Sequence, residues 1–213
     1  MKQIRITLFV MLLILVTQPL QAQFSVGLLG NLSSSNISGD APPKTKYSGR
    51  TGFGHGVILD YKVTDDVTLS LQPMFLPKGT TISYDLPSYK EERDSVDAKF
   101  SYITIPLMVK VNATKVVYVT SGFDIGFLQS ATATMINVDG EKDITDKIQS
   151  TDISVNFGVG FTFKVSSFNL FFEGRYSQGL YNTSNFPDKN ENNIPSDFKN
   201  TGMQLLFGAL YNF

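Results

Sequence analysis

The sequence predicts an all-β protein in which eight antiparallel strands run up and down and close into a transmembrane barrel. From residue 23 onward, apolar and polar residues alternate with period two, which is typical of strands. Beyond the N-terminus, no apolar run approaches the roughly 20 residues of a membrane-spanning helix. Long polar connections alternate with short turns, as they do in outer-membrane barrels.

The first 22 residues are predicted to be a secretory signal peptide. Lys2 and Arg5 form a positive region, residues 6–16 are apolar, and Pro19 and Ala22 precede the expected cleavage point. The apolar run is too short to span a bilayer. We expect the segment to be cleaved, which leaves residues 23–213 as one exported barrel domain, a size that suits a single domain.

The connections divide this domain into eight expected strands. Long loops are expected at 35–50, 78–99, 129–150 and 179–201, and short turns at 62–66, 110–115 and 164–167. The strands between them are 23–34, 51–61, 67–77, 100–109, 116–128, 151–163, 168–178 and 202–213. Pro73 and Pro106 fall inside the third and fourth strands. Each removes a donor from the ladder, so we expect a local bulge or a bridging water there.

The two faces of these strands distinguish a membrane barrel from a soluble barrel with an apolar interior. One face is made of Gly, Ser, Thr, Asn and Gln, and the charges expected in the strands are few. The other face carries bulky apolar rows, which would overfill a narrow interior but suit a lipid-facing wall. Aromatic residues gather at both ends of the apolar face, as in interfacial girdles. They are Phe24, Tyr61, Phe163, Phe168, Tyr211 and Phe213 at the short-turn end, and Phe53, Phe75, Phe127 and Tyr176 at the other.

The last strand resembles the C-terminal signal that barrel-assembly machinery reads. Phe207, Tyr211 and Phe213 share the apolar face, and Phe213 is the last residue. A closed sheet also leaves no unpaired edge in lipid. We therefore expect the outer membrane as the location, with its lipid and the assembly machinery as partners.

Three charged residues are the strongest polar constellation. Glu173 and Arg175 are two apart on one strand and therefore share its inward face, and Asp124 is expected inside at comparable depth. Because buried charges must be paired, we predict an interior network of Asp124, Glu173 and Arg175. It could be a polar plug or the selectivity element of a narrow pore. The width of an eight-stranded barrel favours the plug. Inward glycines such as Gly122 and Gly158 leave both alternatives open.

Composition excludes several other classes. Without cysteine there are no disulfides, thiolate metal sites or lipidated N-terminal cysteine, and 18 basic against 19 acidic residues do not indicate nucleic-acid binding. The single histidine, His55, lacks a serine motif that would support a lipid-modifying triad. The acidic loop at 137–146 lacks the spacing of a calcium-binding EF-hand. We expect no catalytic residue, cofactor or metal.

Over essentially the whole of residues 23–213, the chain resembles the PorT-type outer-membrane β-barrel family. The motifs are Phe24–Leu32, Leu71–Phe75 with Lys78 and Gly79, Tyr102–Leu107, Gly122 with Gly126, Phe172–Tyr176 with Gly179 and Leu180, and the strand ending at Phe213. The resemblance implies an eight-stranded barrel in the outer membrane but no single activity, although the name-giving member is associated with type IX secretion.

We therefore expect a non-enzymatic structural or interaction barrel that meets a protein partner through its extracellular loops or periplasmic turns. A small passive pore or secretion-linked channel is the alternative, and a membrane-embedded lipid-modifying enzyme is a remote one.

Overall fold

The computed structural model describes residues 23–39, 44–84, 95–135, 140–184 and 198–213, so the expected signal peptide lies outside the described residues. No helix in these ranges is long and apolar enough to cross a membrane. A 3₁₀ turn, η2, covers Thr145–Lys147, and the other regular elements in these ranges are strands. The strands are β1 (Phe24–Ser38), β2 (Thr45–Lys62), β3 (Val67–Leu71), β4 (Met74–Tyr84), β5 (Ser95–Asn112), β6 (Val117–Met135), β7 (Glu141–Asp143), β8 (Thr151–Val165), β9 (Phe168–Gly179) and β10 (Lys199–Asn212).

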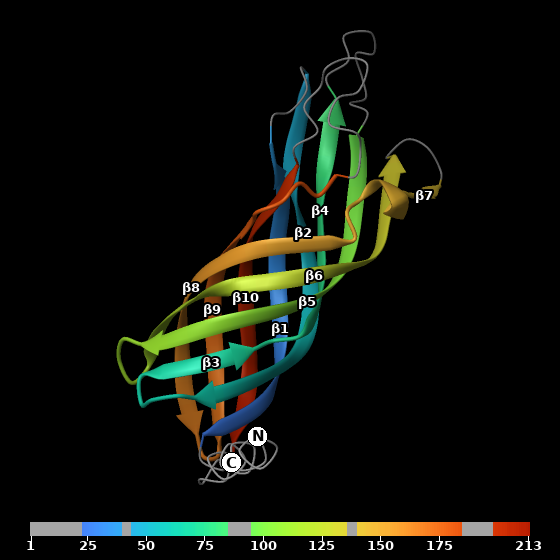
Figure 1. Cartoon of the computed structure of the whole chain (residues 1–213). Helices are drawn as coiled ribbons and strands as arrows, with labels where there is room; N and C mark the ends of the chain where they lie inside the picture. Colours follow the sequence, from blue (N-terminus) through green and yellow to red (C-terminus); the bar gives the residue numbers. More distant parts are fainter. Residues whose placement is uncertain (1–22, 40–43, 85–94, 136–139, 185–197) are drawn as a thin grey trace, which may run out of the picture.

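The strands close into one antiparallel barrel (Figure 1). β1 pairs with β2 on one side and with β10 on the other, and β10, β9, β8, β6 and β5 continue the wall. β3 and β4 follow one another between β2 and β5, so together they fill one position. Within the described residues, β7 pairs with the end of β6 alone. The predicted eight-stranded, up-and-down barrel is confirmed.

The two prolines interrupt the wall without shifting it. The pairs Leu71↔Leu107 and Met74↔Thr104 keep one register across the gap between β3 and β4. Pro106 O accepts the Gln72 N–H at 3.0 Å, and Pro73 O accepts the N–H of the facing β2 strand, also at 3.0 Å. The expectation of a bulge at the prolines is wrong because proline loses only its donor and keeps its acceptor.

Register shifts occur elsewhere in the wall. One lies between Gly49 and His55 on β2 where it pairs with β4, and the other lies at Ser101/Tyr102 on β5 where it pairs with β6. Both are on the half of the barrel nearer the long loops. An extra residue in one strand bends it and increases its twist, so the wall changes direction there.

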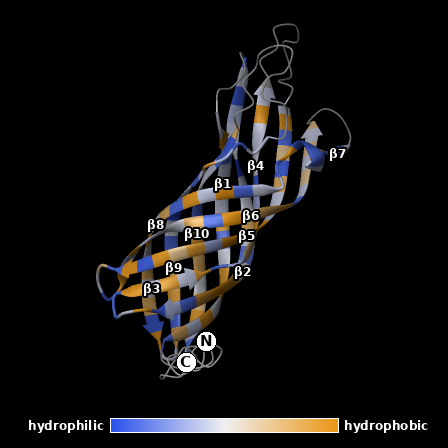
Figure 2. Ribbon diagram, viewed as in Figure 1, coloured by the Kyte–Doolittle hydropathy of each residue, from blue (hydrophilic) through white to orange (hydrophobic). Residues whose placement is uncertain are grey.

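Outward residues are apolar along the middle of the wall (Figure 2). On β8, Phe157, Val159 and Phe161 are about half exposed, whereas Ser154 and Asn156 are fully buried. This alternation is inverted relative to a soluble barrel, as predicted. Exposed apolar rows of this extent fit a wall that faces lipid.

An aromatic girdle lies at the short-turn end, where β1 begins and β10 ends. The Phe24 and Tyr61 ring centroids are 4.9 Å apart. Tyr211 makes edge contacts with Phe168 at 5.5 Å and with Phe213 at 5.2 Å. These contacts join β1 to β2 and β9 to β10 at the level where the apolar wall ends.

Several strands are longer at the long-loop end than the sequence predicts. β2 begins at Thr45, β4 continues to Tyr84, and β5 begins at Ser95, so these strands extend well past the apolar wall (Figure 1). Period-two apolar alternation ends where the lipid-facing wall ends, but backbone pairing continues between polar segments. Lys78, expected in a long loop, therefore lies within β4 and is buried. Lys110, expected in a short turn at the opposite end, lies within β5 and is also buried.

Candidate functional site

A buried polar cluster crosses the centre of the lumen. Arg175 Nε on β9 donates to Glu173 Oε1 at 2.7 Å, and its Nη2 donates to Gln72 Oε1 at 2.7 Å. Tyr118 OH on β6 donates to Glu173 Oε2 at 2.9 Å. All four side chains are at most 2 % exposed. We call Gln72, Tyr118, Glu173 and Arg175 the central cluster. Gln72 directly follows β3, which is far from β9 in the strand order, so Arg175 links opposite sides of the barrel.

Inward glycines give this cluster its room. A Cβ on Gly160 would overlap the ring of Tyr118, and a Cβ on Gly158 would lie 2.9 Å from Thr120 Cγ2 and 3.3 Å from Glu173 Oε1. A Cβ on Gly122 would lie 2.8 Å from Sδ of the fully buried Met108. The sequence left open whether the inward glycines belong to a polar plug or to a narrow pore. These contacts favour the plug, in which glycines make room for bulky neighbours.

Asp124 does not join the central cluster. It is 1 % exposed and inward, as expected, but the described residues provide it with no contact to Arg175. Asp124 faces Ser154 on β8, whereas Arg175 faces Gly158. Four residues of strand correspond to roughly 13 Å. The predicted pairing fails because strand stagger, which the sequence does not display, places the two side chains at different heights.

A second cluster lies nearer the long loops. Lys78 Nζ on β4 contacts Asp152 Oδ2 on β8 at 2.8 Å, and Asn200 Nδ2 on β10 donates to the same oxygen at 3.0 Å. The Lys78 ammonium also lies 5.4 Å from the centre of the Tyr102 ring, within cation–π range. Sequence reasoning missed this cluster because it assigned Lys78 to a loop.

A third ion pair lies towards the short turns. Lys110 Nζ contacts Asp60 Oδ2 at 2.9 Å, and it is 5.6 Å and 5.4 Å from the ring centres of Tyr118 and Phe171. A cavity of about 420 Å³ includes both partners in its lining, together with Lys62, Lys115 and Lys164. The Lys110–Asp60 pair lies between this mouth and the central cluster, because Tyr118 lines the cavity and contacts both Lys110 and Glu173.

Apolar side chains also fill part of the lumen, although the sequence predicted a polar interior. Seven buried residues pack together: Leu29, Ile58, Met74, Leu76, Phe171, Leu206 and Leu210. An eight-stranded barrel is just wide enough to be filled in this way. This cluster and the three ion pairs lie in the interior between the short-turn mouth and the level of Lys78.

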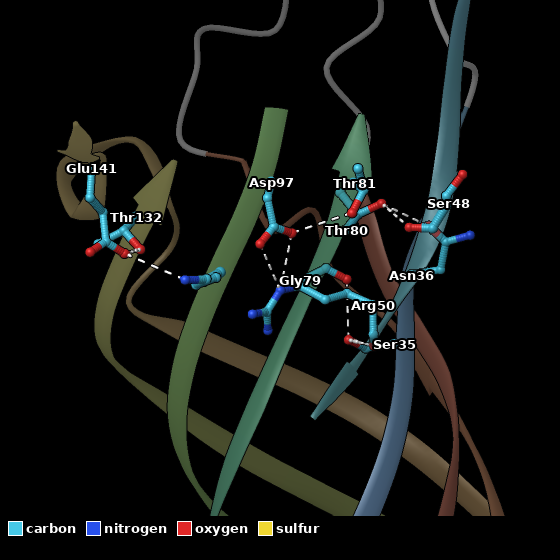
Figure 3. Close-up of polar contacts among 11 residues, drawn as sticks. Ser35, Asn36, Ser48, Arg50, Gly79, Thr80, Thr81, Asp97, Thr132 and Glu141 are labelled. Atoms are coloured by element: carbon cyan, nitrogen blue, oxygen red, sulfur yellow. Dashed lines mark hydrogen bonds and ion pairs between the residues drawn. The ribbon is translucent and has the colours of Figure 1, made fainter. Parts of the chain in front are cut away.

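Above the apolar wall, polar contacts join the extended strands (Figure 3). Arg50 Nε on β2 contacts Asp97 on β5 at 3.1 Å, and Thr81 Oγ1 on the intervening β4 donates to Asp97 at 3.3 Å. Thr80 Oγ1 donates to Asn36 Oδ1 on β1 at 2.9 Å. We call this region, which includes residues 45–50, 79–84 and 95–99, the outer rim.

The remaining candidate sites are His55 and the acidic loop, and their neighbours indicate a structural role for both. His55 points outward between Phe53 and Phe75, with ring centroids 6.5 and 5.8 Å away, and within the described ranges no serine or carboxylate hydrogen-bonds to it. In the acidic loop, the Thr145 N–H donates to Asp143 at 2.8 Å, and the hydrogen bonds of Thr145 lower the pKa of that carboxyl. The described residues contain no group of three His, Cys, Asp or Glu suited to a metal ion.

The predicted C-terminal signal residues all face outward on β10 and its end. The Phe207 ring lies over Gly30 of β1, and Tyr211 packs between Phe168 and Phe213. The Phe213 N–H donates to Phe24 O at 3.3 Å, which ties the end of the chain to the start of β1. Recognition by the assembly machinery stays a prediction.

A family comparison adds to this geometry. The family model described as outer membrane protein beta-barrel domain matches residues 17–185. The chain belongs to this family. The outer membrane is therefore its location, in agreement with the apolar wall and the girdle. No curated protein matches the chain.

Solved structures of other outer-membrane barrels are similar to this member of the family. Ail, the attachment invasion locus protein of Yersinia pestis, is 15% identical with a TM-score of 0.45, and the match covers 90% of this chain and 99% of Ail. Neisserial surface protein A is 14% identical with a TM-score of 0.45, covering 89% and 97%. OprG from Pseudomonas aeruginosa is 12% identical with a TM-score of 0.43, covering 90% and 96%.

Proposed function

We propose that the chain is a non-enzymatic, closed outer-membrane barrel that acts as a structural or interaction protein. The observation that carries this proposal is the filled lumen: three buried ion pairs and an apolar cluster lie between the two mouths. A barrel that passes no solute presents two surfaces to water, the outer rim with its loops and the short-turn mouth. A partner would meet the protein at one of these ends.

The resemblance to PorT-type barrels supports a structural role for the interior. Two of the motifs that carry this resemblance, Leu71–Phe75 and Phe172–Tyr176, meet through the hydrogen bond from Arg175 to Gln72. A third motif supplies Tyr102, which lies against Lys78. On this reading the shared motifs maintain a packed interior, and the outer rim and loops determine the partner.

The outward environment of His55 argues against lipid-modifying chemistry. A triad needs the nucleophile and base in hydrogen-bond contact and an orienting carboxylate, and the aromatic neighbours of His55 supply neither. His55→Ala is expected to leave the lipid A and phospholipid profile of the membrane unchanged. A changed profile in that variant would favour an enzyme.

A narrow pore is the second candidate, and the cavity of about 420 Å³ at the short-turn mouth is the observation in its favour. Such a mouth could be the vestibule of a channel. The Lys110–Asp60 pair at its inner end then has to open for solute to pass.

Site-specific photo-crosslinking in cells tests the interaction role. A photoreactive side chain is introduced at exposed Lys46 of the outer rim and at exposed Asp65 and Lys115 of the short turns, with lipid-facing Val159 as the matched control. We expect a discrete protein adduct from one end and none from Val159. Absence of an adduct from every position would contradict an interaction role.

A further inference from the structure

Asp124 is a buried carboxylate for which the described chain provides no ion pair. Among the described residues below the outer rim, the charged side chains enclosed in the lumen are the cations Lys78, Lys110 and Arg175 and the carboxylates Asp60, Asp124, Asp152 and Glu173. Three contacts pair six of them. The Lys78 ammonium contacts Asp152 and also attracts Asp124, so one cation lies near two carboxylates. These seven groups therefore carry one more negative than positive charge, whereas the lysines at the short-turn mouth are exposed to water.

Oxygen atoms without partners surround this carboxylate. Ser154 faces Asp124 directly across β6 and β8, and Asn156 is its diagonal neighbour on β8. Such neighbours have Cβ atoms about 5–8 Å apart. Asp124 Oδ1, Ser154 Oγ and Asn156 Oδ1 are all buried, and the described residues offer none of them a hydrogen bond. Buried polar atoms in proteins are rarely left without a partner, and three on one inward patch need a common explanation.

We propose that Asp124, Ser154 and Asn156 form a binding site for a hard monovalent cation such as Na⁺. One positive charge brings these seven buried groups to neutrality, and carboxylate, hydroxyl and amide oxygens are the ligands that hard cations prefer. A divalent ion would leave an excess positive charge beside Lys78, and Ca²⁺ usually takes more than one carboxylate. Water completes the coordination and accepts from Asn156 Nδ2, which also lacks a partner among the described residues.

The test measures stability as a function of the cation. The barrel (residues 23–213) is refolded in detergent in NaCl or in tetramethylammonium chloride at equal ionic strength, and urea unfolding is followed by the gel shift between folded and unfolded forms. A ligand that binds only the folded state stabilises it by RT ln(1 + L/Kd), where L is the free ligand concentration, and this stabilisation keeps growing with the logarithm of L above the dissociation constant. Above the dissociation constant, we expect the unfolding equilibrium constant to fall about tenfold for each tenfold rise in Na⁺.

Two matched variants assign the effect to the site. Asp124→Asn is expected to abolish the dependence on Na⁺, and to be more stable than the wild type in tetramethylammonium, because it removes the unpaired charge. Asp65→Asn makes the same chemical change in an exposed turn and should retain the full dependence. Equal wild-type stability in both salts, or a dependence that persists in Asp124→Asn, would overturn the proposal.

A second variant and a spectrum exclude other occupants. Ser154→Ala removes one oxygen ligand without changing the charge, so it should fold and require a higher Na⁺ concentration for the same stabilisation. An unchanged Na⁺ requirement in this variant would count against the site. Infrared spectroscopy reports a protonated carboxyl group directly: its carbonyl band in Na⁺, lost in Asp124→Asn, would show that a proton neutralises Asp124 and would overturn the cation proposal.

Discussion

At the scale of single residues, Arg175 is the most connected side chain of the interior. Its guanidinium donates to Glu173 on the same strand and to Gln72 across the lumen. The Tyr118 hydroxyl donates to the other carboxylate oxygen of Glu173. A planar group with several fixed donors suits this bridging role better than lysine, which offers a compact point charge. Removing it leaves Glu173 as an uncompensated buried charge.

Arg175→Met is therefore expected to destabilise the folded barrel by about 3–5 kcal/mol. Combining it with Glu173→Gln should recover much of that loss, because the unpaired charge is then gone. The free energies of unfolding of both single variants and the double variant, measured in urea, give the coupling energy. We expect it to exceed about 1 kcal/mol, as for residues in one network.

The same cycle performed with Asp124→Asn and Arg175→Met gives a contrasting result. The two side chains are roughly 13 Å apart along the strand direction, so their effects should add to within about 0.5 kcal/mol. A large coupling energy between them would mean that Asp124 and Arg175 are in contact in the membrane, and the strand stagger described above would be wrong.

At the scale of strands, small inward residues determine where large ones fit. Gly160 on β8 faces the Tyr118 ring, and a methyl group there would overlap it. Gly174 on β9 faces outward, and a methyl group there would meet no atom within 4 Å. The two glycines thus have opposite tolerance for a side chain, although their strands are neighbours.

Gly160→Ala is expected to cost about 1–3 kcal/mol of stability through overpacking against Tyr118. Gly174→Ala, the control, should be neutral or slightly stabilising, since glycine weakens a strand interior. Urea unfolding of both variants in one detergent checks this. Equal stability of the two variants would contradict a tightly packed lumen.

Period-two patterning predicts the strands well and their outer ends poorly. Lipid forces an apolar residue at every second position, so the alternation through Val155, Phe157 and Val159 is unambiguous. No such constraint acts above the membrane, where residues 45–50 and 95–99 pair as strands without an apolar row. For the same reason Lys78 was expected in a loop, although it lies in a strand and forms the ion pair with Asp152.

The candidate site was predictable only in part. Two residues on one strand, such as Glu173 and Arg175, share a face by counting alone. Partners on other strands depend on stagger and closure, so Gln72 and Tyr118 were missed and Asp124 was expected too close. The sequence signal that could have indicated Gln72 is its position: it is a long polar side chain next to Pro73, at an inward place in the alternation.

At the scale of the whole molecule, an apolar wall surrounds a filled interior. The outward face of β8 lies at the middle of that wall, where Val159 is 49 % exposed. Val159→Arg is expected to destabilise the barrel in phospholipid vesicles by about 2–4 kcal/mol, since charge on the lipid face is most costly near the midplane.

Thr51→Arg, at an outward position nearer the outer rim, is the control and should cost about 0–1 kcal/mol. Unfolding of both variants from vesicles gives the comparison. If Thr51→Arg were the more costly change, the membrane would surround a different part of the wall from the one assigned here.

Single-channel conductance of the refolded barrel in a planar bilayer tests closure of the lumen most directly. Folding is first verified by the migration shift between unboiled and boiled samples. A lumen closed by Lys78–Asp152, Arg175–Glu173 and Lys110–Asp60 predicts a folded barrel with no current above that of the bare bilayer. Steady, voltage-tolerant conductance from the same sample would contradict it and establish a continuous path of water past all three pairs.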